Sequence, residues 1–345
     1  MNILWQNNQV FNESGLFIGS NKVKLMFNAK KIKQVTLHSL GTIFTEGVDY
    51  SHNEGDNFIT RLDNSSIPYF PEEAIHPTEN VRLYPDANAN AISNAVNGKY
   101  LLFNNKDFFA KNQVDISYEA IDNNLNLVLD SQIDRLPKLR KKLLNKEPIK
   151  ITLIGDSISA GYNATKFIDV PPFMPCYMEL VASYLGENIT LQNRAISGNG
   201  IQHAKNVEQD YLNDKPDLLV IAYGMNNFAK MPIEEFLTTL QSIIDNCQAT
   251  LPDTEYLIVN SMSGNPLWIP TVPGNDEIYA NNIRSFVAKA NENIALADVA
   301  KAWKLFLTRK NFYDLTGNGV NHPNDYGHRI YASVILELLT NKKFF

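Results

Sequence analysis

The chain has 345 residues, of which 44% are hydrophobic and 20% charged, so it can bury a sizeable core and is not a disordered protein. The formal net charge is −6. No basic block stands out beyond Arg140-Lys141-Lys142, which disfavours a nucleic-acid-binding surface. The two cysteines, Cys176 and Cys247, lie outside any CxxC pattern, so the sequence favours neither a metal site nor a disulfide framework.

The N-terminal segment Met1-Asn-Ile-Leu-Trp-Gln has neither the basic region nor the apolar region of a secretory signal. No apolar run approaches the roughly 20 residues that a membrane helix needs. We therefore expect a cytoplasmic protein with no membrane partner. Secretion stays open if residues preceding Met1 have been removed.

Short apolar or alternating runs, separated by clusters of Asn, Gly, Asp and Pro, fill the first 120 residues. Period-two alternation is clearest at Val35–Leu40 and Val114–Tyr118. Several short strands at this spacing predict an all-β, jelly-roll-like sandwich over residues 1–135. The predicted strands span residues 2–6, 22–27, 34–40, 57–62, 81–84, 99–103 and 112–118.

A short amphipathic helix is expected after a polar connection near residues 121–134. Leu136, Leu139, Leu143 and Leu144 are spaced so that they share one helix face, and Pro148 ends the pattern. We interpret residues 136–148 as a helix that links the sandwich to a second domain.

From Ile149 onward, strands and helices alternate. The run 217–223 is apolar almost throughout, as in strands buried on both faces of a sheet. The alternation predicts a parallel sheet with helices on both faces, a three-layer α/β/α domain over residues 149–345. Predicted strands span residues 151–154, 189–193, 217–223, 256–260 and 294–299, and predicted helices span 177–185, 233–247, 278–290, 300–308 and 327–339.

Four polar stretches lie at strand ends or before the last helix of this domain. They are Gly155-Asp-Ser157, Asn193–Gly200, Tyr223–Asn227 and Gly319–Asn324. Because the carboxyl ends of parallel strands meet at one edge of a sheet, we expect the four stretches to converge there. Taken alone, Gly-Asp-Ser is equally well a strand-to-helix turn in which Ser or Asp caps the helix.

Together the four stretches resemble the signature blocks of the SGNH, or GDSL-type, hydrolases. Gly155-Asp-Ser157 matches the nucleophile block, Ser197-Gly198 the glycine block, Gly224-Met-Asn226 the Gly-x-Asn-Asp block and His322-Pro-Asn324 the histidine block. The resemblance spans roughly residue 149 to the C-terminus. It implies a flavodoxin-like SGNH-hydrolase fold for the second domain and the activity of a serine esterase.

The resemblance also implies roles for these residues. Ser157 is the expected nucleophile, and the backbone N–H groups of Ser157 and Gly198 with the side-chain amide of Asn226 form the expected oxyanion hole. A serine hydroxyl needs a base to take its proton, and His322 is the candidate base. Gly198 allows close approach of its backbone and Asn226 offers two N–H donors. Taken alone, Gly198 is equally well a plain turn glycine and Asn226 a strand-end cap.

The other five histidines are weaker candidates for the base. His328 falls inside the predicted last helix, where a core or surface role is expected. His203 follows the glycine block and is a candidate cleft residue. We interpret His38, His52 and His76, which lie in the N-terminal part, as structural.

Two positions depart from the family's pattern. The third block ends in Asn226-Asn227 in place of Asn-Asp, so Asn227 is left to hold the loop by hydrogen bonds. Three residues before His322, where the resemblance implies an Asp, this chain has Gly319.

An amide or main-chain oxygen can still accept the imidazole N–H, although it stabilises the imidazolium less than a carboxylate does. We therefore expect a catalytic pair of Ser157 and His322. Asn318, Asp314 or a main-chain carbonyl is the expected group that orients the imidazole.

A sandwich followed by an SGNH domain resembles some two-domain carbohydrate acetyl esterases. Tyr162, Phe173, Trp268 and Tyr279 are candidate aromatic side chains in the cleft, where their faces would stack on sugar rings. We expect an esterase that removes small acyl groups, acetyl first, from a saccharide or another small ester substrate. No metal ion or organic cofactor is implied, since the chemistry needs only the side chains named.

Two alternatives remain at this point. One is a lipid-directed thioesterase or lysophospholipase. The other is a non-catalytic carbohydrate-binding protein with a decayed hydrolase domain. This alternative arises because the Asp that the resemblance implies three residues before His322 is not at that position. The sequence leaves the oligomeric state and the role of the N-terminal domain open.

Overall fold

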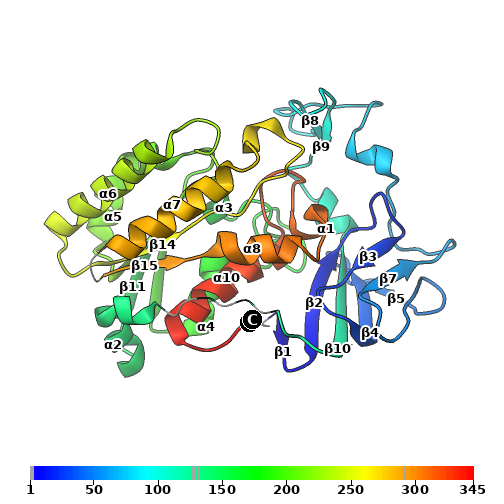
Figure 1. Cartoon of the computed structure of the whole chain (residues 1–345), viewed down its shortest axis with the longest axis horizontal. Helices are drawn as coiled ribbons and strands as arrows, with labels where there is room; N and C mark the ends of the chain where they lie inside the picture. Colours follow the sequence, from blue (N-terminus) through cyan, green and yellow to red (C-terminus); the bar gives the residue numbers. More distant parts are fainter. Residues whose placement is uncertain (1–3, 126, 128, 130–131, 291–292) are drawn as a thin grey trace.

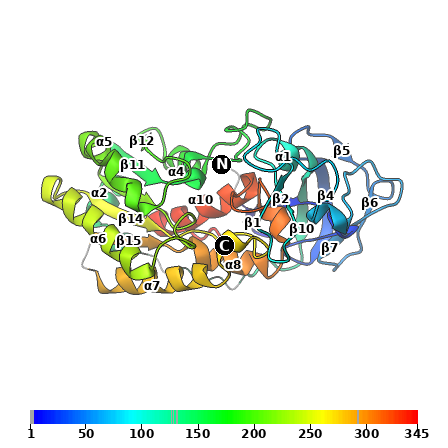
Figure 2. The ribbon, with the colours of Figure 1, turned by 90° about the horizontal axis from the view of Figure 1, so that it is seen from above.

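The computed structural model describes residues 4–125, 127, 129, 132–290 and 293–345. Figure 1 shows two parts side by side: a β-rich part made by the first 120 residues and an α/β part made from about residue 149 onward. The view from above shows the same division along the long axis (Figure 2). This arrangement confirms the predicted fold class.

A five-stranded parallel sheet lies at the centre of the α/β part. Its strand order is β12-β11-β13-β14-β15, which is the 2-1-3-4-5 order of flavodoxin-like sheets. β13 and β14 are buried at every residue, which is why their sequences are almost wholly apolar. The strands are β11 (Ile149–Gly155), β12 (Ile189–Asn193), β13 (Leu218–Ala222), β14 (Glu255–Val259) and β15 (Ile294–Ala297).

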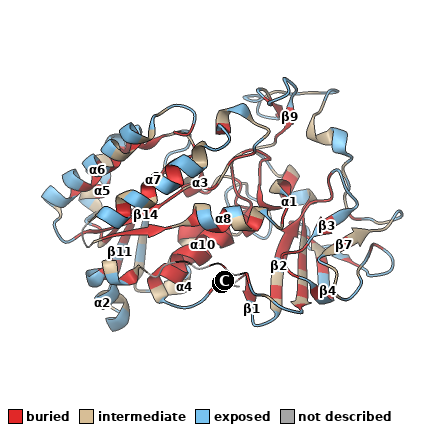
Figure 3. Cartoon of the chain, viewed as in Figure 1, coloured by how far each residue is buried: buried red, intermediate tan, exposed pale blue. Residues whose placement is uncertain are grey.

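Helices cover both faces of this sheet. The helices are α3 (Ser157–Ala160), α4 (Tyr177–Leu185), α5 (Glu208–Asp214), α6 (Ile233–Thr250), α7 (Asn275–Lys289), α8 (Val299–Leu307), α9 (Phe312–Leu315) and α10 (Asp325–Thr340), with 3-10 turns at Ile201–Val207 and Ile269–Thr271. α4 and α10 lie on one face and α5, α6 and α7 on the other (Figure 1). α10 is buried along almost its whole length (Figure 3), because it packs against α4, α8 and the β-rich part.

The β-rich part contains two antiparallel sheets, ordered β1-β2-β10-β4-β5 and β3-β7-β6, and a small β8-β9 pair. In β10, burial alternates with every residue, as the pattern at Val114–Tyr118 predicted. The predicted strand at 81–84 is only an isolated bridge at Leu83. The strands are β1 (Trp5–Gln6), β2 (Gln9–Gly15), β3 (Lys22–Lys24), β4 (Ala29–Leu37), β5 (Ile43–Phe44), β6 (Tyr50–Ser51), β7 (Phe58–Arg61), β8 (Ala91–Ile92), β9 (Leu101–Leu102) and β10 (Val114–Ala120).

Short helical segments complete this half: α1 (Phe108–Asn112) and 3-10 turns at Glu72–Ile75 and Ile133–Arg135. Residues 2 and 3 of the first predicted strand, and residues 126, 128, 130 and 131 of the predicted connection, lie outside the described residues. α2 (Pro137–Asn145) falls within the predicted linker helix. Its first backbone N–H groups, those of Lys138 and Leu139, donate to the carboxylate of Glu255 at 2.9 and 2.7 Å. We keep residues 136–148 as the proposed boundary between the two domains.

Buried polar contacts join the two parts at the loop before α10. The side chain of Gln113 donates to the carbonyl oxygens of Tyr313 and Thr316 at 2.8 and 2.9 Å. Lys310 Nζ lies 2.8 Å from Glu13 Oε1, and both side chains are fully buried. The β-rich part is therefore bonded directly to the segment that contains the histidine block. Within the ranges given above, no helix is both long and apolar enough to cross a membrane.

Candidate active site

Ser157 is the first residue of α3 and lies two residues after Gly155, the last residue of β11. Gly155 is required at this turn, because a Cβ there would lie 2.6 Å from the carbonyl oxygen of Ala222. Asp156 caps α3 by accepting the N–H of Ile158 at 3.0 Å. Burial raises the pKa of Asp156 to about 7, against the opposing effect of its backbone hydrogen bonds. The Gly and the Asp of the motif therefore shape the turn, and the Ser157 hydroxyl is the group left for chemistry.

His322 lies within hydrogen-bonding distance of this hydroxyl. Its Nε2 is 2.9 Å from Ser157 Oγ, and the side chain is only 7% exposed. Burial, with a smaller contribution from the nearby His328, lowers the pKa of His322 to about 3. The imidazole is therefore neutral near pH 7, which is the form that accepts a proton from a serine.

Asn163 contacts the other ring nitrogen of His322. Its Oδ1 lies 2.7 Å from Nδ1. Because an amide oxygen only accepts hydrogen bonds, this contact keeps a proton on Nδ1 and leaves Nε2 to accept from Ser157. The opposite amide orientation would place the proton on Nε2, where it blocks base catalysis. Asn163 has φ of 63°, in the left-handed region that Asn adopts more readily than most residues.

The expectation that Asn318 or Asp314 orients the imidazole is wrong. Asn318 Oδ1 instead accepts the backbone N–H of His322 at 3.1 Å, along with two neighbouring N–H groups, so it shapes the loop. Asp314 accepts the N–H groups of Leu16 and Asn311 at 2.8 and 2.9 Å, so it caps α9 and ties it to the β-rich part. Both side chains therefore accept hydrogen bonds from backbone N–H groups.

Asn163 is not among the residues that the sequence motifs predict for the site. The only signal for it is a polar residue six positions after Ser157, just beyond α3. That position belongs to none of the family's blocks quoted above.

Two of the three expected oxyanion donors, Gly198 and Asn226, follow the carboxyl ends of β12 and β13. Gly198 has φ of 79°, and nothing lies within 4 Å of the point where its Cβ would be, so its backbone is open to approach. Asn226 Nδ2 donates to the carbonyl oxygen of Asn199 at 3.0 Å and retains a second N–H. Asn227 accepts the N–H of Ile201 at 3.1 Å, which confirms that this side chain holds the loop by hydrogen bonds.

Two aromatic rings extend outward from His322. The ring of Tyr162 lies 5.5 Å from that of His322, and the ring of Phe167 lies 4.2 Å from that of Tyr162. Phe167 is 48% exposed. Tyr162 was expected in the cleft, whereas Phe167 was not singled out.

The remaining candidate side chains divide between surface and core. Phe173 is exposed, on the same loop as Phe167. Tyr279 is buried, which overturns the expectation that it lies in the cleft, and Trp268 Nε1 donates to the carbonyl oxygen of Ser93 at 3.1 Å. His328 is buried in α10 with its ring stacked on that of a tyrosine, as a core residue.

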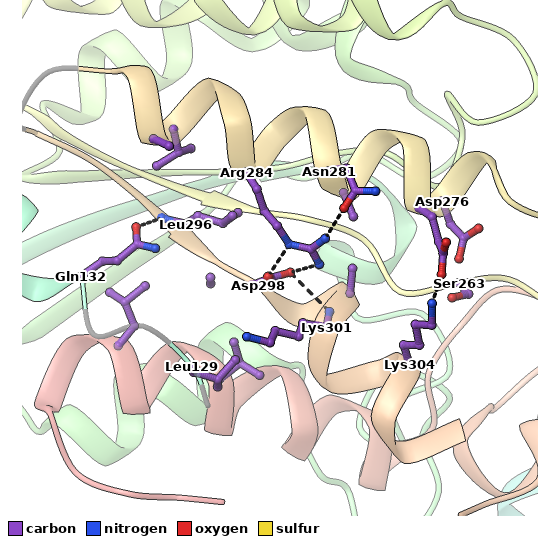
Figure 4. A pocket seen from close by; sticks show the side chains of 18 of the residues that line it. Leu129, Gln132, Ser263, Asp276, Asn281, Arg284, Leu296, Asp298, Lys301 and Lys304 are labelled. Atoms are coloured by element: carbon purple, nitrogen blue, oxygen red, sulfur yellow. Dashed lines mark hydrogen bonds and ion pairs between the residues drawn. The ribbon is translucent and has the colours of Figure 1, made fainter. Parts of the chain in front are cut away.

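A cavity of about 890 Å³ lies elsewhere, between α7, α8 and α10 (Figure 4). Two ion pairs lie in its lining: Arg284 binds Asp298 through two hydrogen bonds of 2.6 and 2.9 Å, and Lys304 pairs with Glu277. Neither Ser157 nor His322 lines it. This cavity is therefore separate from the site where ester hydrolysis is expected, despite its volume.

The fold and the motifs at the edge of its sheet define an ester hydrolase of the α/β/α class. Residues 153–330, more than half of the chain, match the GDSL-like Lipase/Acylhydrolase family. The chain belongs to this family and is an ester hydrolase of the GDSL type, as the resemblance predicted. A search of curated proteins gives no match.

Several solved structures are similar in fold. One is a variant of an acetyl-xylooligosaccharide esterase from Geobacillus, with 20% identity, 56% of this chain and 95% of that chain covered, and a TM-score of 0.44. Another is a two-domain esterase active on acetylated mannans, with 20% identity, 61% and 54% covered, and a TM-score of 0.48. A third is a lipase/acylhydrolase from Enterococcus faecalis, with 20% identity, 57% and 98% covered, and a TM-score of 0.44. Similarity at this level carries no conclusion about the substrate.

Proposed function

We propose that this protein is a serine esterase that removes small acyl groups, acetyl first, from a saccharide. Ser157 is the nucleophile, His322 the general base, and Asn163 the residue that orients His322. The observation that carries this proposal is the continuous chain of contacts from Ser157 Oγ through His322 to Asn163 Oδ1, at 2.9 and 2.7 Å.

In the proposed reaction, His322 Nε2 takes the proton of Ser157 Oγ as the oxygen attacks the ester carbonyl carbon. The oxyanion accepts hydrogen bonds from the N–H groups of Ser157 and Gly198 and from the side chain of Asn226. The imidazolium then gives its proton to the departing alcohol oxygen, and an acyl-serine remains. A water molecule, deprotonated by His322, attacks this acyl group, and the carboxylic acid leaves as Ser157 regains its proton.

Asn163 makes this proton transfer harder than a carboxylate would. Its amide oxygen fixes the ring and the tautomer, but it provides only a dipole opposite the imidazolium. Burial also disfavours the charged form of His322. We therefore expect an enzyme that is slower than a carboxylate triad on the same ester.

The saccharide assignment is supported by the aromatic surface beside His322. The alcohol part of the ester lies next to His322, because that side chain protonates it as it leaves. Tyr162 and the exposed ring of Phe167 extend from the same point. An exposed aromatic face gives a sugar ring a flat apolar surface to pack against, at small conformational cost to the protein.

The first test is hydrolysis of p-nitrophenyl acetate by the wild type and by Ser157→Ala. No Ser157-dependent turnover would sink the catalytic proposal and favour a binding protein. Acetylated oligosaccharides then test the substrate class: Phe167→Ala should raise KM for them about tenfold, a loss of about 1.4 kcal/mol, and leave p-nitrophenyl acetate hydrolysis unchanged. Equal effects on both substrates would contradict the sugar surface.

A lipid-directed esterase is the second candidate. The observation that favours it is the exposure of both Phe167 and Phe173 on one loop beside the site. The two candidates differ in acyl-chain preference. A kcat/KM for p-nitrophenyl octanoate above that for the acetate would support the lipid-directed reaction over the saccharide esterase.

A further inference from the structure

A histidine from the β-rich part is linked through Asp325 to the loop that contains Asn163. His38 follows β4, and its Nδ1 lies 2.9 Å from Asp115 Oδ2 while its Nε2 lies 3.0 Å from Asp325 Oδ2. Asp325 is the first residue of α10 and is 1% exposed. Its carboxylate accepts the backbone N–H of Thr165 at 2.8 Å and the Thr165 hydroxyl at 2.6 Å. Thr165 is two residues after Asn163.

His38 carries a positive charge in this arrangement. Burial alone would lower its pKa, but the charges and hydrogen bonds of Asp115 and Asp325 outweigh burial and raise the pKa to about 10. Only the cation donates from both ring nitrogens at once. A carboxylate as deeply buried as that of Asp325 needs such a partner, because an uncompensated charge inside a protein is strongly unfavourable.

Asp325 is connected to both residues of the contact between His322 and Asn163. It lies three residues after His322 in the chain, and it anchors the loop of Asn163 through Thr165. The side chain of Asn163 has no second anchor within the described residues, since its Oδ1 bonds to His322 and its buried Nδ2 has no partner. The backbone of its loop must therefore set where Oδ1 lies.

We propose that His38 is a positioning residue for catalysis, which acts through Asp325 and Thr165 to hold Asn163 against His322. The β-rich part is then a component of the catalytic machinery, beyond any role in binding substrate or covering the sheet. This inference rests on the proposed roles of Ser157 and His322.

The test is His38→Gln in the full chain, assayed with p-nitrophenyl acetate. Glutamine can still donate to Asp325, but it brings no charge and cannot bridge both carboxylates. We expect kcat to fall about tenfold or more with KM nearly unchanged, because small displacements of a catalytic group are costly. The ¹H NMR resonance of His322 Nδ1–H, which reports the contact with Asn163, should shift or broaden.

His52→Gln is the matched control. His52 also lies in the β-rich part, and its two ring nitrogens lie 3.1 Å from the carbonyl oxygens of Phe58 and Ala29. Its loss should affect stability without moving kcat or the His322 resonance. If His38→Gln behaves in the same way, lowering only the melting temperature, the inference is overturned.

A second variant covers the case in which His38→Gln does not fold. Thr165→Val removes the hydroxyl bond to Asp325 and leaves every charge in place, so the same resonance shift and a smaller loss of kcat are expected. An unchanged resonance and kcat would overturn the inference. A wild type without Ser157-dependent turnover would refute the proposed function instead, and the resonance would still test the link from His38 to His322.

Discussion

Replacement of Asn163 by Ala removes the only hydrogen-bond acceptor that the described structure provides for His322 Nδ1. In the transition state this bond joins an amide oxygen to a positively charged ring, and hydrogen bonds to charged groups contribute about 1.5–3 kcal/mol. At about 1.36 kcal/mol per factor of ten, kcat should fall roughly 10- to 160-fold. The loss is larger if the freed imidazole adopts the tautomer with its proton on Nε2, which cannot accept from Ser157.

The assay is steady-state hydrolysis of p-nitrophenyl acetate, with kcat and KM separated. KM should change little, because Asn163 lies behind the imidazole and not against the ester. Titration of Ser157 with a serine-directed phosphonate counts the folded sites, so a loss of protein is not mistaken for a loss of rate. A kcat within twofold of the wild type would refute the role given to Asn163.

Asn163→Asp supplies the matched variant of nearly equal shape. A carboxylate beside Nδ1 favours the imidazolium, so the pKa of His322 should rise from its lowered value and the acid limb of the kcat/KM profile should move to higher pH. The carboxylate oxygen that replaces the unpartnered Nδ2 is buried, so the melting temperature should fall. An acid limb that does not move would show that residue 163 does not face the ring in solution.

Three further outcomes are expected. The pKa of His322 is lowered from 6.5 to about 3, so this group favours the folded state fully above about pH 6.5 and loses that contribution as pH falls toward 3; a resonance assigned to His322 that titrates near pH 6.5 would contradict this. Asn226→Ala should lower kcat about 10²- to 10³-fold with little change in KM, and an unchanged kcat would remove it from the oxyanion hole. Lys310→Met leaves Glu13 buried without its cation and should lower the free energy of unfolding by about 3–5 kcal/mol in urea titrations. A change below about 1 kcal/mol would contradict the importance of this ion pair.

The α/β part was predictable because its burial is simple. β13 is apolar at every position, and in α6 the buried residues Phe236, Leu240, Ile243 and Cys247 recur at helical spacing. In these elements the spacing of apolar residues along the chain is enough to predict which residues are buried. The order of the motifs then placed Ser157 at the end of the first strand of the parallel sheet.

The β-rich part was harder to predict for a physical reason. β2 contains Glu13 and Ser14, two polar residues that are buried and so hide the expected alternation. Their partners, Lys310 and Asn324, lie about 300 residues away in the chain. No pattern in the neighbouring sequence predicts hydrogen bonds or ion pairs between residues so far apart in the chain.

The same limit explains the error over the orienting group. Asp314 and Asn318 were favoured because they are close to His322 in sequence. Asn163 reaches the ring only after two distant loops have met, a separation of 159 residues. Motif order predicted the pair Ser157 and His322, whose side chains lie 2.9 Å apart, while the contact of His322 with Asn163 depends on tertiary structure.

The buried ion pair of Glu13 and Lys310 also affects how the chain is made. The two residues are 297 positions apart, so at about 5–20 residues per second the ribosome delivers the lysine roughly 15–60 s after the glutamate. During that interval Glu13 has no cation to accompany it into the interior. We therefore expect the packing of the β-rich part against the α/β part to be completed only after Lys310 has left the ribosome.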